Sequence, residues 1–187
     1  SGIPIVLFGT EEALHGVDDI ETIFVSEVVG MDEDPGQAVR RKKDSSLIRA
    51  AEYVRDGHAS AMVSAGNTGA TMASALLRMG RLKGVSRPAI ATPIPTLEGD
   101  HPVILLDSGA NAECQSEWLL QFAEMGAVYA RDRFDVGKPK VGLLSIGEEA
   151  GKGNSLIKDS YDILNSGDWQ TICKAEFIGN VEGRDLM

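Results

Sequence analysis

Cysteine and histidine are scarce in this sequence, which limits the chemistry that it can support. The two cysteines, Cys114 and Cys173, lie far apart, and the three histidines, His15, His58 and His101, are scattered singly. Metal sites are commonly built from closely spaced cysteines and histidines, so we expect no bound metal. Two separate thiols also favour a reducing compartment, which indicates the cytoplasm.

Positive charge and long apolar stretches are also missing. The 187 residues carry 18 lysines and arginines against 28 aspartates and glutamates, and the resulting net charge of −10 argues against nucleic acid as a partner. No apolar run approaches the roughly 20 residues that a membrane-spanning helix needs. A hydrophobic content of 43% and a charged content of 25% are typical of a soluble globular protein, and the length suits one ordinary domain.

The most informative stretch that is present is KVGLLSIGEEAGKGNSL, at residues 140–156. Its apolar run at 141–146 has the pattern of a strand that is buried on both faces. A helix follows, and either Asn154 or Ser155 can cap it. Because ligands of open α/β sheets bind at the carboxyl ends of the strands, we take this loop as the first candidate for chemistry.

The loop matches neither of the two best-known phosphate-binding motifs. The nucleoside-triphosphate loop needs four residues between its first glycine and Gly-Lys, but only three separate Gly147 from Gly151. The dinucleotide fingerprint lacks its third glycine. Lys152 lies between Gly151 and Gly153, so backbone amides and an ammonium group can approach the same anion. The alternative is a solvated turn whose lysine has no role.

Predicted strands alternate with helices along the chain, which is typical of an α/β fold, a three-layer α/β/α sandwich with a largely parallel sheet. The predicted strands cover residues 3–8, 22–29, 59–65, 88–95, 103–106, 141–146 and 175–178. Four loops rich in glycine, asparagine and acidic residues follow strand ends, at Gly66, Asp107, Gly147 and Gly179. One such loop is explained by turn chemistry, whereas four at one sheet edge indicate a cleft.

The sequence has one basic run, Arg40-Arg41-Lys42-Lys43, which precedes a predicted helix that Asp44 or Ser45 caps and that runs to about residue 55. One interpretation is the solvated start of that helix. The other is a docking patch for an acidic partner protein.

Six motifs, taken in order along the chain, resemble those of the PlsX-type phosphate acyltransferases, and the resemblance covers essentially the whole sequence. They are RRKKDSS (40–46), SAGNTGA (64–70), LLDSGAN (105–111), FAEMGAVYA (122–130), VGLLSIGEEAGKGN (141–154) and FIGNVEGRDL (177–186). The resemblance implies an enzyme that moves a fatty acyl group from acyl carrier protein to inorganic phosphate for phospholipid synthesis. It also implies a fold similar to phosphotransacetylases and isocitrate dehydrogenases, and no cofactor. The implied assembly is a cytoplasmic homodimer that associates loosely with the inner face of the membrane.

The resemblance also implies residue roles. Lys152 matches a lysine implicated in catalysis, and we place Asn154 beside it in the catalytic group. The predicted substrate-binding residues are Gly66, Asn67, Thr68, Gly69, Asp107, Gly109, Asn111, Gly151, Gly153, Asn180 and Glu182. We expect Asp107 and Glu182 to orient hydrogen-bond donors. For Asn180 we favour a role in forming a turn over a role in binding substrate. Cys114 is a minor candidate as an acyl-carrying nucleophile, because no basic residue lies near it in sequence.

Some family features have no counterpart here, namely an opening strand with a DAMGGD loop and a later GFTGN-like loop. We therefore expect residues 1–187 to form a single α/β domain that is incomplete at both ends and inactive by itself. Ser108 also stands where valine is usual. Two other functions stay open: a non-catalytic sensor that binds phosphate or a nucleotide, and a coenzyme A-dependent phosphotransacetylase.

Overall fold

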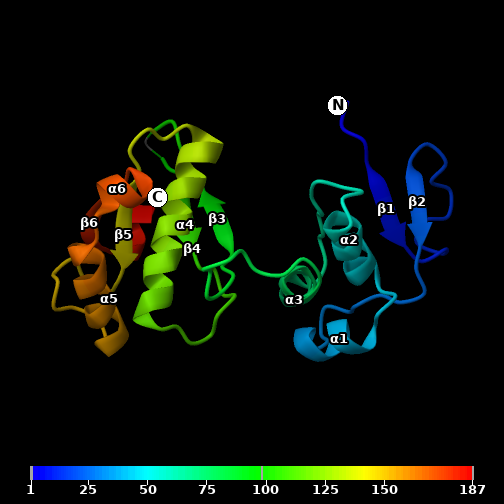
Figure 1. Cartoon of the computed structure of the whole chain (residues 1–187), viewed down its shortest axis with the longest axis horizontal. Helices are drawn as coiled ribbons and strands as arrows, with labels where there is room; N and C mark the ends of the chain where they lie inside the picture. The colour runs from blue at the N-terminus through cyan, green and yellow to red at the C-terminus, as the bar shows by residue number, and fades with distance from the viewer. Residues whose placement is uncertain (1, 98, 187) are drawn as a thin grey trace. The chain divides into compact units, whose positions relative to one another are not determined.

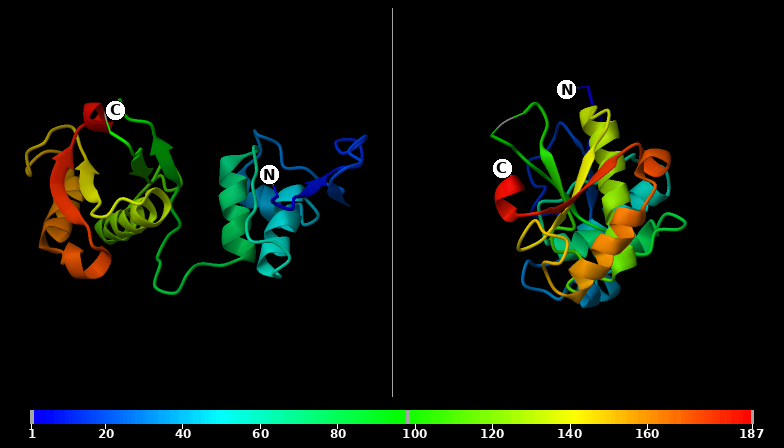
Figure 2. Two further views of the ribbon diagram at one scale, coloured as in Figure 1. Left: turned by 90° about the horizontal axis from the view of Figure 1, so that it is seen from above. Right: turned by 90° about the vertical axis from the view of Figure 1, so that its left-hand side faces the viewer.

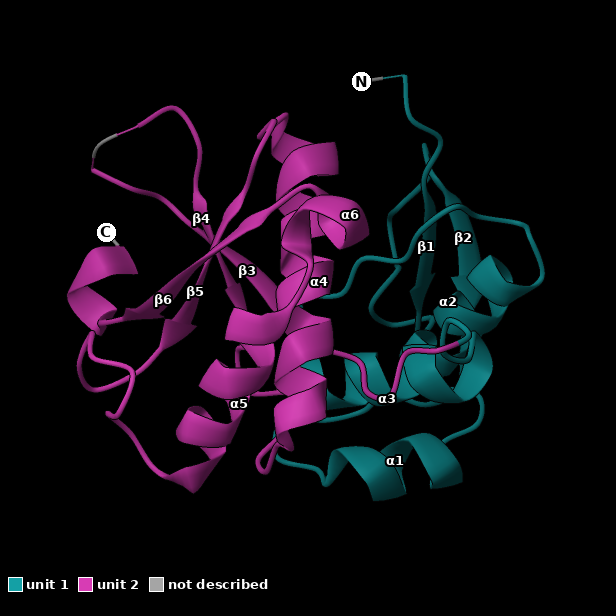
Figure 3. Cartoon of the chain, turned by 60° about the vertical axis from the view of Figure 1, so that its left-hand side comes forward, with its two compact units in different colours: residues 1–83 teal, residues 84–187 magenta. Residues whose placement is uncertain are grey.

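The computed structural model describes residues 2–97 and 99–186. The chain divides into two compact units, residues 1–83 and 84–187, and each unit has its own hydrophobic core (Figure 3). Both units contain strands and helices, so the predicted α/β class is confirmed. The expectation of one incomplete domain stays a prediction.

Unit 1 contains one pair of parallel strands and three helices (Figure 1). The strands are β1 (Val6–Gly9) and β2 (Glu21–Phe24), and the helices are α1 (Pro35–Arg41), α2 (Ser46–Arg55) and α3 (Thr68–Arg78). The predicted helix that ends at about residue 55 is confirmed, and of its two predicted caps Ser45 is the one that stands at the N-cap position.

The core of unit 1 forms where the three helices meet. Val39 of α1 and Ile48 of α2 are fully buried, and Ala70 of α3 packs with them. Helix α1 begins where it does because the carboxylate of Asp34 accepts a hydrogen bond from the Gln37 amide at 2.7 Å. Proline at the first position of α1 supports the same start.

The described residues of unit 2, 84–97 and 99–186, form two pairs of strands, three α-helices and a short 3₁₀ helix. Its strands are β3 (Ala91–Ile94), β4 (Val103–Leu106), β5 (Lys140–Leu144) and β6 (Glu176–Val181), and its helices are α4 (Ser116–Phe134), α5 (Ser155–Ser166), α6 (Trp169–Cys173) and η1 (Gly183–Leu186). β3 and β4 pair antiparallel, whereas β5 and β6 pair parallel. The prediction of a largely parallel sheet is therefore right for β5 and β6, whereas β3 runs antiparallel to β4.

Helices α4, α5 and α6 pack on β5–β6 and build the core of unit 2. Figure 2 shows α4 and α5 on the same side of this strand pair. Leu164 of α5 is 1% exposed and packs in one cluster with Leu143 of β5 and Trp169 of α6. Leu144 points to the opposite face of the strand and is 42% exposed, and Ile146 is 84% exposed. The prediction that this strand is buried on both faces is therefore wrong for the described chain.

Two other predicted strands also differ from the structure. Residues 59–65 form no strand, because the segment pairs with no described strand, and Val63 within it is 97% exposed. The strand predicted at 22–29 ends at Phe24. Among the described residues, no helix is both long and apolar enough to cross a membrane.

Replacing Leu164 tests the core of unit 2. We expect Leu164→Ala to lower the free energy of unfolding by about 2–5 kcal/mol, because the substitution leaves a cavity among packed side chains. Leu97→Ala is the matched control, since Leu97 is 91% exposed in the same unit, and it should change stability by less than about 0.5 kcal/mol. Urea unfolding followed by tryptophan fluorescence reports on unit 2, which holds both tryptophans, Trp118 and Trp169. Equal effects of the two substitutions would contradict this packing.

Candidate functional site

The glycine-rich loop at residues 145–154 leaves the carboxyl end of β5, as predicted. Parallel pairing with β6 fixes its starting point, since Leu144 lies opposite Val181 and the Ser145 amide donates to the Val181 carbonyl at 2.8 Å. The ladder has a register shift between Val141 and Gly142. A side chain at Gly142 would place its Cβ only 2.6 Å from the Val181 Cγ1 atom, so glycine is required for this close pairing.

Asn180 ties the loop to the strand pair. It lies within β6, is 5% exposed, and donates from Nδ2 to the Glu149 carbonyl at 2.9 Å. The interpretation of Asn180 as a turn former is wrong, because β6 continues through Val181. The fifth of the six residues of β6 therefore holds the middle of the loop that follows β5.

Two buried polar atoms near this loop have no hydrogen-bond partner among the described residues. They are Oδ1 of Asn180 and Oγ of Ser145. A buried polar group without a partner costs about 1–3 kcal/mol, so such atoms commonly mark a place where water or a ligand binds. Sequence reasoning missed Ser145, which stands inside an apolar run and carries no motif signal of its own.

Lys152 is exposed at the tip of the loop. Its side chain is 52% exposed, and its ammonium group lies 4.0 Å from the Glu149 carboxylate. The Lys152 amide donates to the Glu149 carbonyl at 2.9 Å, so this amide is used within the loop. None of the hydrogen bonds of the described residues uses the amides of Gly151 or Gly153. The loop therefore offers the ammonium group of Lys152 to an anion, with the open amides of Gly151 and Gly153 on either side of it.

The glycines of the loop have different roles. Gly153 has φ +93, and a Cβ there would lie 2.7 Å from the Cβ of Ile157, so both its conformation and its contact require glycine. Nothing lies within 4 Å of a Cβ built at Gly151, which leaves that side of the loop open. Asn154 accepts a hydrogen bond from the Ile157 amide at 3.0 Å, which confirms the predicted cap of α5.

Arg184 adds a second cation that the sequence motifs did not single out. Its guanidinium lies 3.1 Å from the Glu148 carboxylate and 3.4 Å from the Glu182 carboxylate. The hydrogen bond to Glu148, followed by the charge of Glu182, raises the pKa of Arg184. These contacts offset acidic charge that would otherwise repel an anion at the loop.

Asp107 organises a separate turn after β4. Its carboxylate accepts hydrogen bonds from the amides of Ile90, Ala110 and Asn111 at 2.9, 3.1 and 2.9 Å. Nδ2 of Asn111 donates to this carboxylate at 2.8 Å and to the Pro88 carbonyl at 2.9 Å. Both N–H bonds of the Asn111 amide are thus used within the turn, so this side chain supports the loop and has no donor left for a substrate.

Two further residues of this turn were candidates. Gly109 has φ +94, the left-handed conformation that favours glycine, so its place in the turn follows from backbone geometry. Burial, and then the charge of Asp107, raise the pKa of the Cys114 thiol. A raised pKa leaves less of the reactive thiolate near neutral pH, which argues against Cys114 as an acyl-carrying nucleophile.

The predicted residues at 66–69 belong to unit 1. The Gly66 amide donates to the Ser64 hydroxyl at 3.1 Å. Asn67 caps α3 by accepting from the Ala70 amide at 3.0 Å, and its Nδ2 lies 3.1–3.3 Å from three carbonyl oxygens of residues 30–33. Asn67 is therefore a structural residue. The described hydrogen bonds do not use the backbone amides of Thr68 and Gly69 at the start of α3.

The basic run ends a helix and does not begin one. Arg40 and Arg41 form the last turn of α1, and Lys42 caps it. The interpretation as a solvated helix start is therefore wrong. The ammonium group of Lys42 donates to the Val28 carbonyl at 2.7 Å and pairs with Glu33, whereas Arg40, Arg41 and Lys43 are exposed.

The structure thus brings the loop at 145–154 together with Asn180, Glu182 and Arg184 in unit 2. No hydrogen bond or ion pair found among the described residues links the Asp107 turn to this loop, and the residues at 66–69 lie in the other unit. Within residues 2–97 and 99–186, no group of three or more histidines, cysteines, aspartates or glutamates is placed to hold a metal ion.

The fold places the chain in the class of α/β proteins, and it resembles the fold of a solved phosphotransacetylase. The solved structure of EutD phosphotransacetylase from Staphylococcus aureus matches with a TM-score of 0.58 and covers 92% of this chain and 56% of that chain. The two sequences are 20% identical, so this likeness shows the fold alone.

Sequence relatives define the family within that class. Residues 3–187 match the family model described as fatty acid synthesis protein. A phosphate acyltransferase from Elusimicrobium minutum is 49% identical over 97% of this chain and 54% of its own length. Phosphate acyltransferases from Thermoanaerobacter pseudethanolicus and Dictyoglomus turgidum are 47% and 46% identical over 98% and 100% of this chain, and 54% and 56% of their own lengths. The chain belongs to this family and spans about half the length of these relatives.

The hydrogen bond from Asn180 predicts how the loop responds to a substitution. Asn180→Asp removes the donor and sets a carboxylate against the Glu149 carbonyl, so the loop should open more often. We expect trypsin to cleave after Lys152 about tenfold faster, equivalent to roughly 1.4 kcal/mol of local stability. Asn165→Asp is the control, because Asn165 is exposed near the end of α5. Unchanged cleavage at Lys152 would show that Asn180 does not hold the loop.

Proposed function

We propose that this chain carries part of the active site of a phosphate acyltransferase, which moves a fatty acyl group from acyl carrier protein to inorganic phosphate. The relatives that match 97–100% of this chain support the reaction type. The observation that carries the proposal is the loop that Asn180 anchors, which presents Lys152 and the open amides of Gly151 and Gly153.

The reaction needs placement and charge stabilisation more than a protein nucleophile. A phosphate oxygen attacks the thioester carbonyl carbon, and the carbon–sulfur bond breaks to release the carrier thiol. Lys152 would offset the charge on phosphate or on the developing oxyanion, and the open amides of Gly151 and Gly153 would hold oxygens. Asn154 acts through the cap of α5, which fixes the end of the loop.

Other parts of the proposal extend beyond this loop. The amides of Thr68 and Gly69 at the start of α3 would donate hydrogen bonds to substrate oxygens, because no described hydrogen bond uses them. Glu182 would orient a hydrogen-bond donor, namely the guanidinium of Arg184 with which it pairs. We also propose a cytoplasmic homodimer, with loose association at the inner face of the membrane. Family membership supports these proposals.

Two rival functions give different results in one assay. A sensor would bind phosphate without consuming thioester, and a phosphotransacetylase would use short acyl groups on coenzyme A. The test measures phosphate-dependent loss of thioester from acyl carrier protein by a full-length family protein that contains residues 1–187. We expect loss that requires both the carrier and phosphate. Activity on acetyl-coenzyme A alone, or binding without turnover, would contradict the proposal.

Lys152→Ala is the sharpest test of the loop in the same full-length protein. We expect turnover to fall about 10²- to 10³-fold, because one charge-stabilising donor is lost. The melting temperature should change little, since the side chain is 52% exposed.

Lys152→Arg should recover part of the loss, because a planar guanidinium fits differently between two glycines. Lys158→Ala, at an exposed position of α5, is the control. A Lys152→Ala rate above about a tenth of the unaltered rate would exclude a catalytic role.

Reversing charges in the basic run tests docking of the carrier. Since acyl carrier protein is acidic, we expect Arg40→Glu with Arg41→Glu to weaken its apparent affinity and to flatten the salt dependence. Lys43 belongs to the same exposed patch, whereas Lys42 is held within unit 1. Lys83→Glu with Lys158→Glu is the control of equal charge change. If both double variants behave alike, the patch has no docking role.

A further inference from the structure

Glu149 places a carboxylate directly beside the ammonium group of Lys152 in the loop at 145–154. Its Oε2 atom lies 4.0 Å from Nζ of Lys152. A Cβ built at Gly147 would lie 3.1 Å from this same Oε2 atom and 3.0 Å from Cγ of Lys152. Both side chains therefore lie against Gly147, where the absence of a side chain lets them approach each other.

The backbone of Glu149 is held by two hydrogen bonds. Its carbonyl accepts from Nδ2 of Asn180 and from the Lys152 amide, both at 2.9 Å. These bonds fix the point from which the Glu149 side chain leaves the loop. Among the described residues, no hydrogen bond reaches the Glu149 carboxylate, whose side chain is 72% exposed. The carboxylate of the neighbouring Glu148, by contrast, accepts from Arg184 at 3.1 Å.

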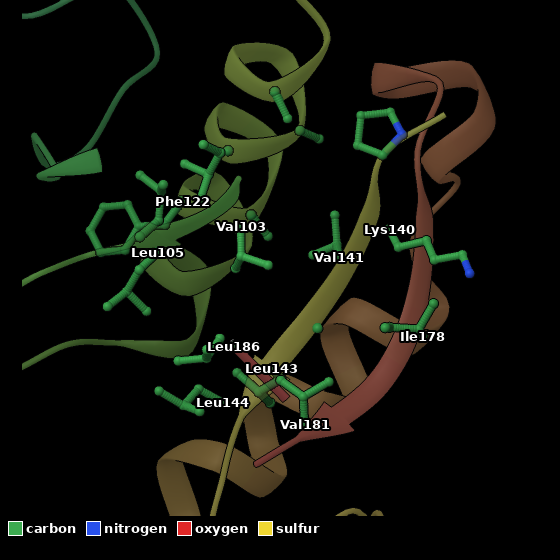
Figure 4. Close-up of a pocket in the computed structure, with 18 of the residues that line it drawn as sticks. Val103, Leu105, Phe122, Lys140, Val141, Leu143, Leu144, Ile178, Val181 and Leu186 are labelled. Atoms are coloured by element: carbon green, nitrogen blue, oxygen red, sulfur yellow. The ribbon is translucent and has the colours of Figure 1, made fainter. Parts of the chain in front are cut away.

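Solvent has direct access to the pair formed by Glu149 and Lys152. An apolar cavity of about 450 Å³ lies between β4 and β5 (Figure 4), and no residue of the loop at 145–154 lines it. The side chains of Glu149 and Lys152 are both more than half exposed. The pair therefore suits a small ion that arrives from solution, and not an apolar ligand.

A carboxylate in an anion site distinguishes anions by whether they carry a proton. An ionised carboxylate only accepts hydrogen bonds, and it repels an anion that has no hydrogen to donate. Hydrogen phosphate and sulfate are both tetrahedral dianions of similar size, but only hydrogen phosphate has an O–H group. Repulsion by the carboxylate is therefore similar for the two ions, whereas the hydrogen bond forms with phosphate alone.

The other groups that the loop offers to an anion do not make this distinction. The ammonium group of Lys152 and the amides of Gly151 and Gly153 are donors only, so they bind both dianions alike. Of the two carboxylates in the loop, that of Glu148 is used by Arg184. The carboxylate of Glu149 is thus the acceptor available to a bound anion.

We propose that Glu149 accepts a hydrogen bond from the O–H group of bound hydrogen phosphate and thereby selects phosphate over sulfate. This inference rests on the proposed function, which puts phosphate at this loop. Lys152 and the amides of Gly151 and Gly153 bind ionised oxygens of the same ion. Because Glu149 holds the O–H oxygen, the oxygen that attacks the thioester is an ionised one, which is the better nucleophile.

The test measures how well sulfate competes with phosphate in a full-length family protein that contains residues 1–187. The ratio of the sulfate inhibition constant to KM for phosphate is read in the thioester assay at about pH 8, where phosphate is mostly a dianion. We expect Glu149→Gln to lower this ratio about tenfold, because a glutamine amide can donate to sulfate and no charge-assisted bond to phosphate remains. Glu148→Gln removes the same charge from the same loop and should leave the ratio unchanged.

A binding measurement keeps the test decisive if Glu149→Gln abolishes turnover. NMR titrations of the ¹⁵N-labelled 187-residue chain with sodium phosphate and with sodium sulfate, at constant ionic strength, give the ratio of the two dissociation constants. We expect the unaltered chain and Glu148→Gln to prefer phosphate, and Glu149→Gln to lose most of this preference.

Three results would overturn the role of Glu149. The unaltered protein binds sulfate as well as phosphate, or Glu149→Gln leaves the ratio unchanged, or Glu148→Gln lowers the ratio as much. The last result would show that charge in the loop, and not a hydrogen bond, sets the preference. Phosphate-dependent loss of thioester in the unaltered protein would still support the proposed function in each case. Without that loss the proposed function is wrong, and the two titrations still decide whether Glu149 selects phosphate.

Discussion

The hydrogen bond from Asn180 to the Glu149 carbonyl is the contact on which the candidate site depends. It joins the interior of β6 to a largely exposed loop, and the strand pair that carries both is closely spaced at Gly142. The helix cluster around Leu164 holds that strand pair from one side. The packed helices thus hold the strand pair, the strand pair holds Asn180, and Asn180 holds the loop that carries Lys152.

Most of the predicted polar residues turn out to support loops. Asn67, Asn111 and Asn154 hold the backbone of their own turns or helix starts, and Asp107 orients backbone amides as expected. Since these asparagines are used within their own turns, fewer groups are available to bind an anion at the loop of unit 2. The cations near that loop are Lys152 and Arg184, and the amides beside Lys152 are open.

The sequence predicts local features well and long-range contacts poorly. The α/β class, the α5 cap at Asn154 and the position of the glycine-rich loop follow from hydrophobic pattern and capping chemistry, which act over a few residues. The strand placement of Asn180 was missed because Gly-Asn is also a turn signal. Arg184 was missed because its partner Glu148 lies 36 residues away in sequence, so no local pattern reveals the pair.

The most direct test of the account is an NMR titration of the ¹⁵N-labelled protein with inorganic phosphate at constant ionic strength. The account predicts saturable shifts that are largest at the amides of Gly151 and Gly153, with smaller shifts at Ser145. Replacing Lys152 with alanine should weaken the binding without moving its location. Shifts that grow without saturation, or that are largest away from residues 145–154, would contradict the assignment of this loop as the phosphate site.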